Sequence, residues 1–225
     1  MTHKLPISSS FGGKRIGIFG GSFNPPTTAH KELADFIYHE LDLDHLLWMV
    51  APHNPEKDPA SLAEFNHRYQ MVDLYLKDRP MMQPSDIEQR NQSSWTIDTV
   101  RLLRAQHPDD ALFFIIGTDN WLNFHLWGRD FEEILLKNVS LVIMERPGYD
   151  AAIHAESSRI FADNRVSNPA ELKPFGSWCI VSNPSFDVAA TNIRKALKKG
   201  EKPQHLDAEI HEYIKKHGLY PPLSD

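Results

Sequence analysis

Apolar and polar positions along the chain follow two periods, one typical of buried strands and one typical of amphipathic helices. Short apolar runs predict strands at residues 16–19, 45–50, 111–116, 139–144 and 178–181, with a weaker candidate at 81–87. Helical spacing predicts helices at residues 28–41, 65–76, 93–106, 155–161, 191–200 and 208–220. Strands that alternate with helices are typical of an α/β fold around a parallel sheet. In such a sheet, ligands bind beyond the carboxyl ends of the strands.

Length and composition fit one domain. A chain of 225 residues, 41% of them hydrophobic, can bury a good core in a single α/β unit. Residues 1–14 are polar and rich in Gly and Ser, and we expect them to form a mobile N-terminal tail. Residues 15–225 would form the domain, with a small C-terminal helical part at about 188–220. Residues 150–176 show no strong period and predict loops around one short helix.

The segment Arg15–His30 combines features that suit an anion. The strand at 16–19 is followed by Gly20 and Gly21, which we expect to turn sharply and to leave the backbone bare. A helix begins near Thr28, so its positive end and its first N–H groups would face the same spot as the loop. A phosphate suits that geometry, although an ordinary strand–turn–helix connection would have a similar sequence.

The spacing within this segment excludes two familiar phosphate motifs and matches a third. Neither G-x-G-x-x-G nor G-x-x-x-x-G-K-[ST] is present. The pattern G-G-S-F-N-P-x-T-x-x-H, from Gly20 to His30, resembles the [HT]-x-x-H signature of the nucleotidylyltransferase superfamily. It is most similar to the nicotinate/nicotinamide-mononucleotide adenylyltransferases, of the bacterial nicotinate-nucleotide type. The resemblance implies a Rossmann-like, doubly wound parallel sheet in three α/β/α layers.

The same resemblance assigns residues to ATP. His30, together with Thr27, would contact the ATP phosphates as a catalytic group. Four residues would bring the backbone close to the nucleotide: Gly20, Gly21, Ser22 and Phe23. The loop after the strand at 45–50 carries the family's Asn-Pro-x-Lys pattern, and Lys57 would lie near the phosphates. Without the resemblance, a lysine after a turn is usually just solvated.

A second family signature, [IV]-S-x-T-x-x-R, is matched near the C-terminal end by Thr191 and Arg194. Thr191 would bind ATP, and Arg194 would act on a phosphate as a catalytic group, because Arg offers planar and permanently charged donors. The sequence departs from the signature at Ala189, where Ser is common, so one hydroxyl ligand is missing. Taken alone, Arg194 would be interpreted as a charge on a helix surface.

The segment Trp95-Thr96-x-Asp-Thr stands where the family binds the carboxylate or amide of the pyridine ring. Ser93 or Ser94 can cap a helix at this point, and the first N–H groups of a helix favour a carboxylate. The resemblance therefore places Trp95 and Thr96 on the mononucleotide side. The simpler alternative is that Trp95 packs against the helix start as a hydrophobic staple.

Two more residues would complete the mononucleotide side. Asp119 follows a predicted strand and matches the family's Gly-x-Asp, near the ribose and phosphates. Trp127 matches the tryptophan that stacks on the pyridine ring, for which an aromatic face is a suitable platform. Trp121 competes for that role, but its place after Asp119 suggests core packing. Arg68, on an amphipathic helix, is interpreted as a surface charge.

Charge and cysteine content narrow the classes of function. A net charge of −6 argues against a broad nucleic-acid surface but allows a local positive pocket for small anions. The single cysteine, Cys179, lies in an apolar strand, so we expect a buried thiol and a reducing compartment. No segment predicts a signal peptide or a membrane span. We therefore expect a cytoplasmic protein without nucleic-acid or membrane partners. The twelve histidines show no zinc-site spacing.

The activity that the resemblance implies is adenylyl transfer from ATP to nicotinate mononucleotide, which gives nicotinate adenine dinucleotide and pyrophosphate in NAD biosynthesis. Positioning and electrostatics supply such catalysis. Mg²⁺ would arrive with ATP, held by phosphates and water, so no protein ligand for a metal is expected. Three alternatives stay open: nicotinamide mononucleotide as the substrate, a related nucleotidylyltransferase that acts on phosphopantetheine or a polyol phosphate, and a non-catalytic dinucleotide sensor. The missing Ser at Ala189 is the one sequence feature that favours the sensor. A homo-oligomer also stays open.

Overall fold

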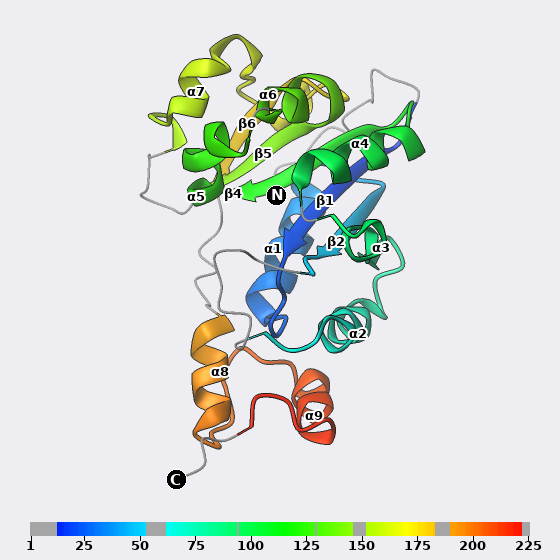
Figure 1. Ribbon diagram of the computed structural model, residues 1–225, viewed down its shortest axis with the longest axis vertical. Coiled ribbons are helices and arrows are strands. Elements are labelled where there is room, and N and C mark those ends of the chain that lie inside the picture. Colours follow the sequence, from blue (N-terminus) through cyan, green and yellow to red (C-terminus); the bar gives the residue numbers. More distant parts are fainter. Residues whose placement is uncertain are drawn as a thin grey trace, which may run out of the picture.

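A single parallel sheet forms the centre of the molecule (Figure 1). The computed structural model describes residues 13–52, 62–93, 95–128, 130–145, 152–182 and 190–221. The sheet has six strands, which are, in spatial order, β3 (Met82–Ser85), β2 (His45–Val50), β1 (Arg15–Gly21), β4 (Ala111–Gly117), β5 (Ser140–Glu145) and β6 (Trp178–Ser182). Every neighbouring pair is parallel. The strand order reverses between β1 and β4, so the sheet is doubly wound.

Helices cover both faces of the sheet and give the three predicted layers. One face packs against α1 (Thr28–Glu40) and α2 (Phe65–Leu76), and α8 (Ala190–Lys198) and α9 (Ala208–Lys216) extend the core on that side. The other packs against α3 (Ile87–Asn91), α4 (Thr96–Gln106), α5 (Thr118–Asn123), α6 (Phe131–Glu133) and α7 (Glu156–Ile160), with short turns at Phe124–Leu126 and Ile134–Asn138. Figure 1 shows α8 and α9, in orange to red, at the end of the molecule that also holds α2.

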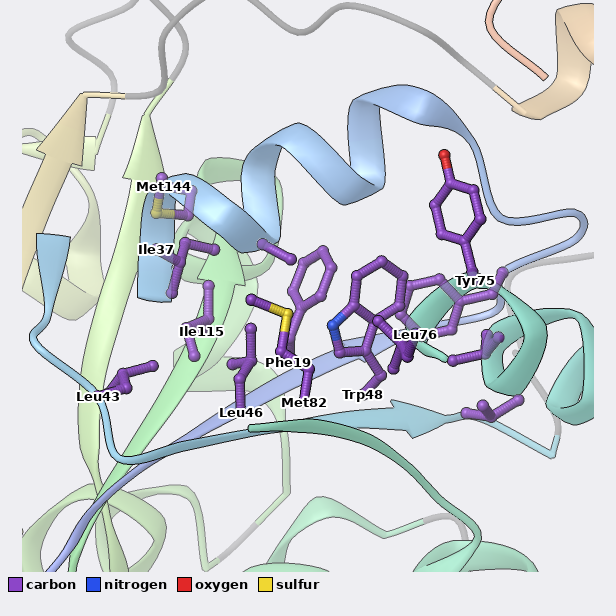
Figure 2. Packing of buried hydrophobic residues seen from close by; sticks show 14 of the residues in the cluster. Phe19, Ile37, Leu43, Leu46, Trp48, Tyr75, Leu76, Met82, Ile115 and Met144 are labelled. Atoms are coloured by element: carbon purple, nitrogen blue, oxygen red, sulfur yellow. The ribbon is translucent and has the colours of Figure 1, made fainter. Parts of the chain in front are cut away.

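Side chains that alternate along the strands build a separate core on each face. On β2, Leu46 and Trp48 point into the first core, whereas Met49 points into the second. Figure 2 shows Trp48 in the first core between Phe19 of β1 and Tyr75 of α2. The Trp48 side chain is fully buried, and a side chain of this size contributes about 2–3 kcal/mol by leaving water. This alternation fixes the register of the strands and therefore the positions of the loops at their ends.

The structure confirms the predicted α/β fold and every predicted strand. β3 is shorter than its predicted range because Ile87 turns away into α3 and packs in the second core. The helical turns between 118 and 138 were not predicted. The stretch 152–176 holds α7 and short turns at Ala162–Asn164 and Pro169–Glu171, as the weak pattern there allowed.

The predicted tail falls almost wholly outside the described residues. At its end, the backbone N–H of Lys14 donates to Asp110 Oδ1 at 2.7 Å. The division into a tail and a domain with a C-terminal helical part stays a prediction. Among the described helices, none combines the length and the apolar character that a bilayer span requires.

Candidate functional site

Many of the predicted site residues lie at or beyond the carboxyl ends of β1 and β4. These two strands are direct neighbours, with Phe19 opposite Ile115. The chain leaves β1 toward α1 on one face and leaves β4 directly into α5 on the other face. Connections that diverge in this way open a crevice at the point where the strand order reverses.

The loop after β1 turns at Phe23 and not at the two glycines, so the predicted sharp turn at Gly20–Gly21 is wrong. Both glycines stay in β1, paired with Met49 and Val50. Phe23 has a φ of 44° and a ring that is only 2% exposed. A Cβ on Gly21 would lie 2.8 Å from that ring, so the glycine makes room for the buried phenyl group. A Cβ on Gly20 would make only an ordinary contact, 3.5 Å from Met49 Cε.

His30 is fixed by the first turn of its own helix. Thr27 is the N-cap of α1, and its Oγ1 accepts the backbone N–H of His30 at 3.3 Å. In return, His30 Nδ1 accepts the backbone N–H of Thr27 at 3.0 Å. A backbone N–H can only donate, so these bonds assign the proton of the neutral ring to Nε2. The ring therefore presents an N–H donor, which suits a phosphate oxygen.

Asn24 joins the loop after β1 to two distant parts of the chain. Its Oδ1 accepts the hydroxyl of Tyr220 at 2.6 Å and the backbone N–H of Ala63 at 3.0 Å. Its backbone oxygen accepts Nη1 of Arg194 at 2.8 Å. Arg194 Nη2 also donates to Thr191 Oγ1 at 3.2 Å. The structure thus brings Arg194 of the second signature, with Thr191 bonded to it, to the loop that carries the first signature. Burial raises the pKa of the Tyr220 hydroxyl, which keeps it protonated as a donor.

Arg68 is buried, and its interpretation as a surface charge is wrong. The residue is 1% exposed, and its guanidinium donates to four backbone oxygens. Nη1 donates to Ser22 at 2.8 Å and to Ala51 at 2.6 Å. Nη2 donates to Pro52 at 3.0 Å, and Nε donates to Ala63 at 2.8 Å. The Arg68 guanidinium therefore binds three segments around the site to one another.

The start of α4 carries no capping side chain among the described residues. Its N-cap is Trp95, rather than a serine as predicted, and that side chain is 65% exposed. This exposure does not fit the alternative of a hydrophobic staple. Ser93 lies just outside the helix, where its Oγ donates to Asp98 Oδ2 at 2.7 Å and accepts the N–H of Trp95 at 3.2 Å. Ser94 lies outside the described residues. Thr96 thus begins a helix whose first N–H groups can meet an acceptor.

Asp119 and Trp127 lie on the segment after β4. Asp119 is exposed in the first turn of α5. Trp127 is half-buried and lies edge-on to Phe124, with 5.2 Å between the ring centroids. Trp121 is fully buried, and its Nε1 donates to Ser158 Oγ at 2.8 Å, which confirms its predicted core role. Trp127 thus has a supported ring that is still partly open to solvent.

Glu88 is a buried carboxyl group that the sequence did not single out. It lies on α3, is 6% exposed, and has Thr99 Oγ1 of α4 at 3.5 Å. Burial raises the pKa of Glu88 to about 7. This acid therefore changes charge near neutral pH next to the helix that begins at Trp95.

Two predicted features fall outside the described residues, namely Lys57 and the substitution at Ala189. Within the described stretches, no group of three or more His, Cys, Asp and Glu side chains could hold a metal ion. The donors gathered near the loop after β1 are N–H and hydroxyl groups, which suit phosphate oxygens. They fit a cation that arrives already bound to phosphate.

Comparisons with known proteins agree with this geometry. The model of the cytidylyltransferase-like family matches residues 18–196, so the fold and the site define a nucleotidyltransferase. A Bacillus pumilus protein named probable nicotinate-nucleotide adenylyltransferase is 34% identical over 211 residues, which cover 92% of this chain and 98% of the relative. One with the same name from Klebsiella pneumoniae is 32% identical and covers 90% and 95%. The chain belongs to the nicotinate-nucleotide adenylyltransferase family within the cytidylyltransferase-like proteins.

A solved structure supports the fold independently. The nicotinic acid mononucleotide adenylyltransferase of Plasmodium falciparum, complexed with NaAD, superposes with a TM-score of 0.67 at 22% identity. The match covers 92% of this chain and 97% of the other.

Three buried residues that organise the site were not predicted from the sequence. Arg68 carried a signal, because it lies at helical spacing among apolar residues that face the core. Asn24 lies inside the first signature, but its side-chain partners are remote in the sequence. Tyr220 carried no local signal, because its partner lies 196 positions away.

Proposed function

We propose that the protein transfers the adenylyl group of ATP to nicotinate mononucleotide, forming nicotinate adenine dinucleotide and pyrophosphate in NAD biosynthesis. One observation carries the proposal: Asn24 holds Arg194 against the loop that leads to the Thr27–His30 capping box. This contact supports the inference that two donor groups, from opposite ends of the chain, act in one crevice. The names of the Bacillus and Klebsiella relatives support the choice of substrate.

In this reaction an oxygen of the mononucleotide phosphate attacks the α-phosphorus of ATP. The bond from that phosphorus to the bridging oxygen breaks, and pyrophosphate leaves with the electron pair. The attacking oxygen is already ionised at neutral pH, so no general base is needed. We propose that His30 Nε2–H and the guanidinium of Arg194 stabilise the charge that develops on the phosphates, with Thr27 and Thr191 orienting them.

The loop after β1 would hold ATP through its backbone. Gly20 and Gly21 leave the end of β1 without side chains, and Ser22 and Phe23 carry the chain into the turn. Backbone N–H groups at such a position suit phosphate oxygens. We also assign Lys57 to the phosphates, from its sequence pattern alone.

The mononucleotide would lie on the side of α4 and α5. No described side chain caps α4, so its start at Trp95 and Thr96 would offer the N–H groups of the first turn and a positive dipole end to the pyridine carboxylate. Trp127 offers a partly exposed ring for stacking, and Asp119 lies where it could accept ribose hydroxyls. These roles favour the acid over the amide, because the dipole attracts a full negative charge.

ATP-dependent nucleotidyl transfer requires a divalent cation to neutralise the phosphates, and we propose Mg²⁺ bound to ATP. We propose a cytoplasmic location, because the one cysteine is a buried thiol and the substrates are small metabolites.

Pyrophosphate release tests the proposal. The purified protein would be given Mg-ATP with nicotinate mononucleotide or nicotinamide mononucleotide in parallel assays. We expect release with both reagents present, and faster release with the acid. Faster release with the amide would reassign the substrate. Silence with both, in a protein that binds ATP, would point to a nucleotide sensor and contradict the proposal.

A further inference from the structure

Arg68 connects the parts of the chain that surround the crevice. Its four acceptors belong to the loop after β1 (Ser22), the segment after β2 (Ala51 and Pro52) and the segment before α2 (Ala63). Ala51 and Pro52 precede residues 53–61, and Ala63 follows them. One guanidinium therefore ties both ends of that stretch to the residue that precedes the Phe23 turn.

Within the described part of the chain, no group neutralises the charge of Arg68. The acceptors of its guanidinium are uncharged peptide oxygens, and no described carboxylate lies within ion-pair distance of it. Burial lowers the pKa of the guanidinium, but the ordinary value is so high that the group stays charged at neutral pH. A buried charge without a counter-ion is unfavourable unless hydrogen bonds or a ligand compensate it. A polyanion bound at the loop after β1 would supply the missing negative charge.

We propose that Arg68 is a positioning residue for the nucleotide triphosphate: it fixes the loop after β1 and supplies, from behind that loop, a positive charge that the polyanion neutralises. The residue acts through Ser22 and the neighbouring peptides, not by touching the ligand. This inference rests on the proposed function only in taking ATP as the ligand of that loop.

A second arginine in the same molecule provides a matched control. Arg104 also donates to several backbone oxygens, including those of Asp110 at 2.7 Å and Asn138 at 2.8 Å. Asp110 directly precedes β4, and Asn138 lies just before β5, so both acceptors stand at the amino ends of strands. That edge of the sheet is opposite to the crevice. Arg104 therefore shares the hydrogen-bonding role of Arg68 but not its location.

The experiment compares four variants: Arg68→Met, Arg68→Lys, Arg104→Met and Arg104→Lys. For each we would measure Tm, the Kd for Mg-ATP by calorimetry without mononucleotide, and kcat and KM for pyrophosphate release. Both members of each pair lose backbone hydrogen bonds, so Tm falls in all four. Only the Arg68 variants should also change nucleotide binding and turnover.

For Arg68→Met we expect the Kd for Mg-ATP to rise by at least about tenfold, because both charge and loop support are lost. Arg68→Lys keeps the charge but not the planar fork, so Kd should rise less while kcat falls by about tenfold. The Arg104 variants should keep Kd and kcat within about twofold of the wild type. If Arg68→Met does not fold, the comparison of Arg68→Lys with Arg104→Lys decides.

Two results would overturn the proposal. One is a folded Arg68→Met protein whose Kd for Mg-ATP stays within about twofold of the wild type. The other is an Arg68→Lys protein whose kcat matches that of Arg104→Lys at a similar Tm. The calorimetric measurement needs no mononucleotide. If the wild type bound Mg-ATP but released no pyrophosphate, the proposed function would fail while the Arg68 comparison stayed valid.

Discussion

At the scale of single residues, the site depends on side chains whose hydrogen bonds fix their orientation and their role as donors. His30 receives the Thr27 N–H at Nδ1, so the other nitrogen is the donor of the neutral ring. Arg194 donates to the Asn24 backbone through one nitrogen and to Thr191 through another. Both side chains are therefore oriented before a ligand binds, which lowers the entropy lost on binding.

Removing either group should affect turnover far more than folding. We expect His30→Ala and Arg194→Ala each to lower kcat by about 10²–10³-fold, because each removes a donor to developing phosphate charge. Steady-state pyrophosphate release measures the effect, and circular dichroism checks the fold. Lys198→Ala is the control for Arg194→Ala, because Lys198 is an exposed cation one turn further along α8. Near-normal turnover in either site variant would refute its assignment.

Glu88 makes the stability of the fold depend on pH. Its pKa is about 7 in the folded state and near the ordinary 4.5 when unfolded, so the folded state holds the extra proton between these values. Stability is therefore lost as the pH rises from about 4.5 to 7. Glu88→Gln should remove this loss and raise the free energy of unfolding at pH 8 by roughly 2–3 kcal/mol, with little change below pH 4.5. Urea unfolding at several pH values measures it, and equal effects at pH 4 and pH 8 would contradict it.

At the scale of elements, the end of β1 and the loop after it use their two glycines for different purposes. Gly21 makes room for the buried ring of Phe23, whereas Gly20 has ordinary space around its α-carbon. A side chain at Gly21 would disturb the protein itself. A side chain at Gly20 would disturb only something that approaches the exposed backbone.

The two glycine-to-alanine variants should therefore have opposite signatures. We expect Gly21→Ala to lower Tm by several degrees, because the added Cβ would lie 2.8 Å from the Phe23 ring. Gly20→Ala should keep Tm but weaken Mg-ATP binding by about tenfold, because the methyl group would meet the phosphates. Thermal unfolding and calorimetry measure the two effects. A Gly20→Ala protein with unchanged Kd would show that ATP does not approach this backbone.

The elements themselves could be predicted from the sequence because they depend on local periodicity. The apolar run 45–50 has the same bounds as β2, and the helical stripe 65–76 has the same bounds as α2. Motif spacing also singled out Thr27 and His30, although as phosphate-binding residues and not as the pair that caps α1. Two features could not be predicted because they depend on packing and on contacts between segments. The chain turns at Phe23 because its ring packs against Gly21, and Arg68 is buried because its acceptors come from three segments.

At the scale of the whole molecule, the C-terminal helical part is joined to the site and to α2. Tyr220 donates to Asn24 of the loop after β1, while Tyr213 donates to Gln70 of α2 at 3.0 Å. Lys77 and Glu209 form an ion pair at 2.6 Å across the same α2–α9 contact. Of these three contacts, the Tyr220 bond is the one that reaches the loop after β1. Variants of the two tyrosines can therefore distinguish two roles of the C-terminal part: its docking to α2 and its support of the site.

Replacing each tyrosine by phenylalanine tests that separation. We expect both variants to lose about 1 kcal/mol of unfolding free energy, because Tyr220→Phe loses a buried hydroxyl bond to Asn24 and Tyr213→Phe loses hydroxyl bonds to Gln70 and His67. Tyr220→Phe should in addition lower kcat/KM for ATP several-fold, by about 1 kcal/mol of transition-state stabilisation, because Asn24 loses a support. Tyr213→Phe should leave kcat/KM unchanged. Equal kinetics in the two variants would show that the Tyr220 bond supports only the fold.

The bond from Tyr220 to Asn24 also bears on the order in which the protein is made. A ribosome that has synthesised α8 has already added the glycines, His30 and Arg194 to the chain, but not the tyrosine whose hydroxyl completes the support of Asn24. Nucleotide binding should therefore mature only when translation has passed Tyr220. A shortened product that ends before it would contain every signature motif and yet compete poorly with the finished protein for cellular ATP.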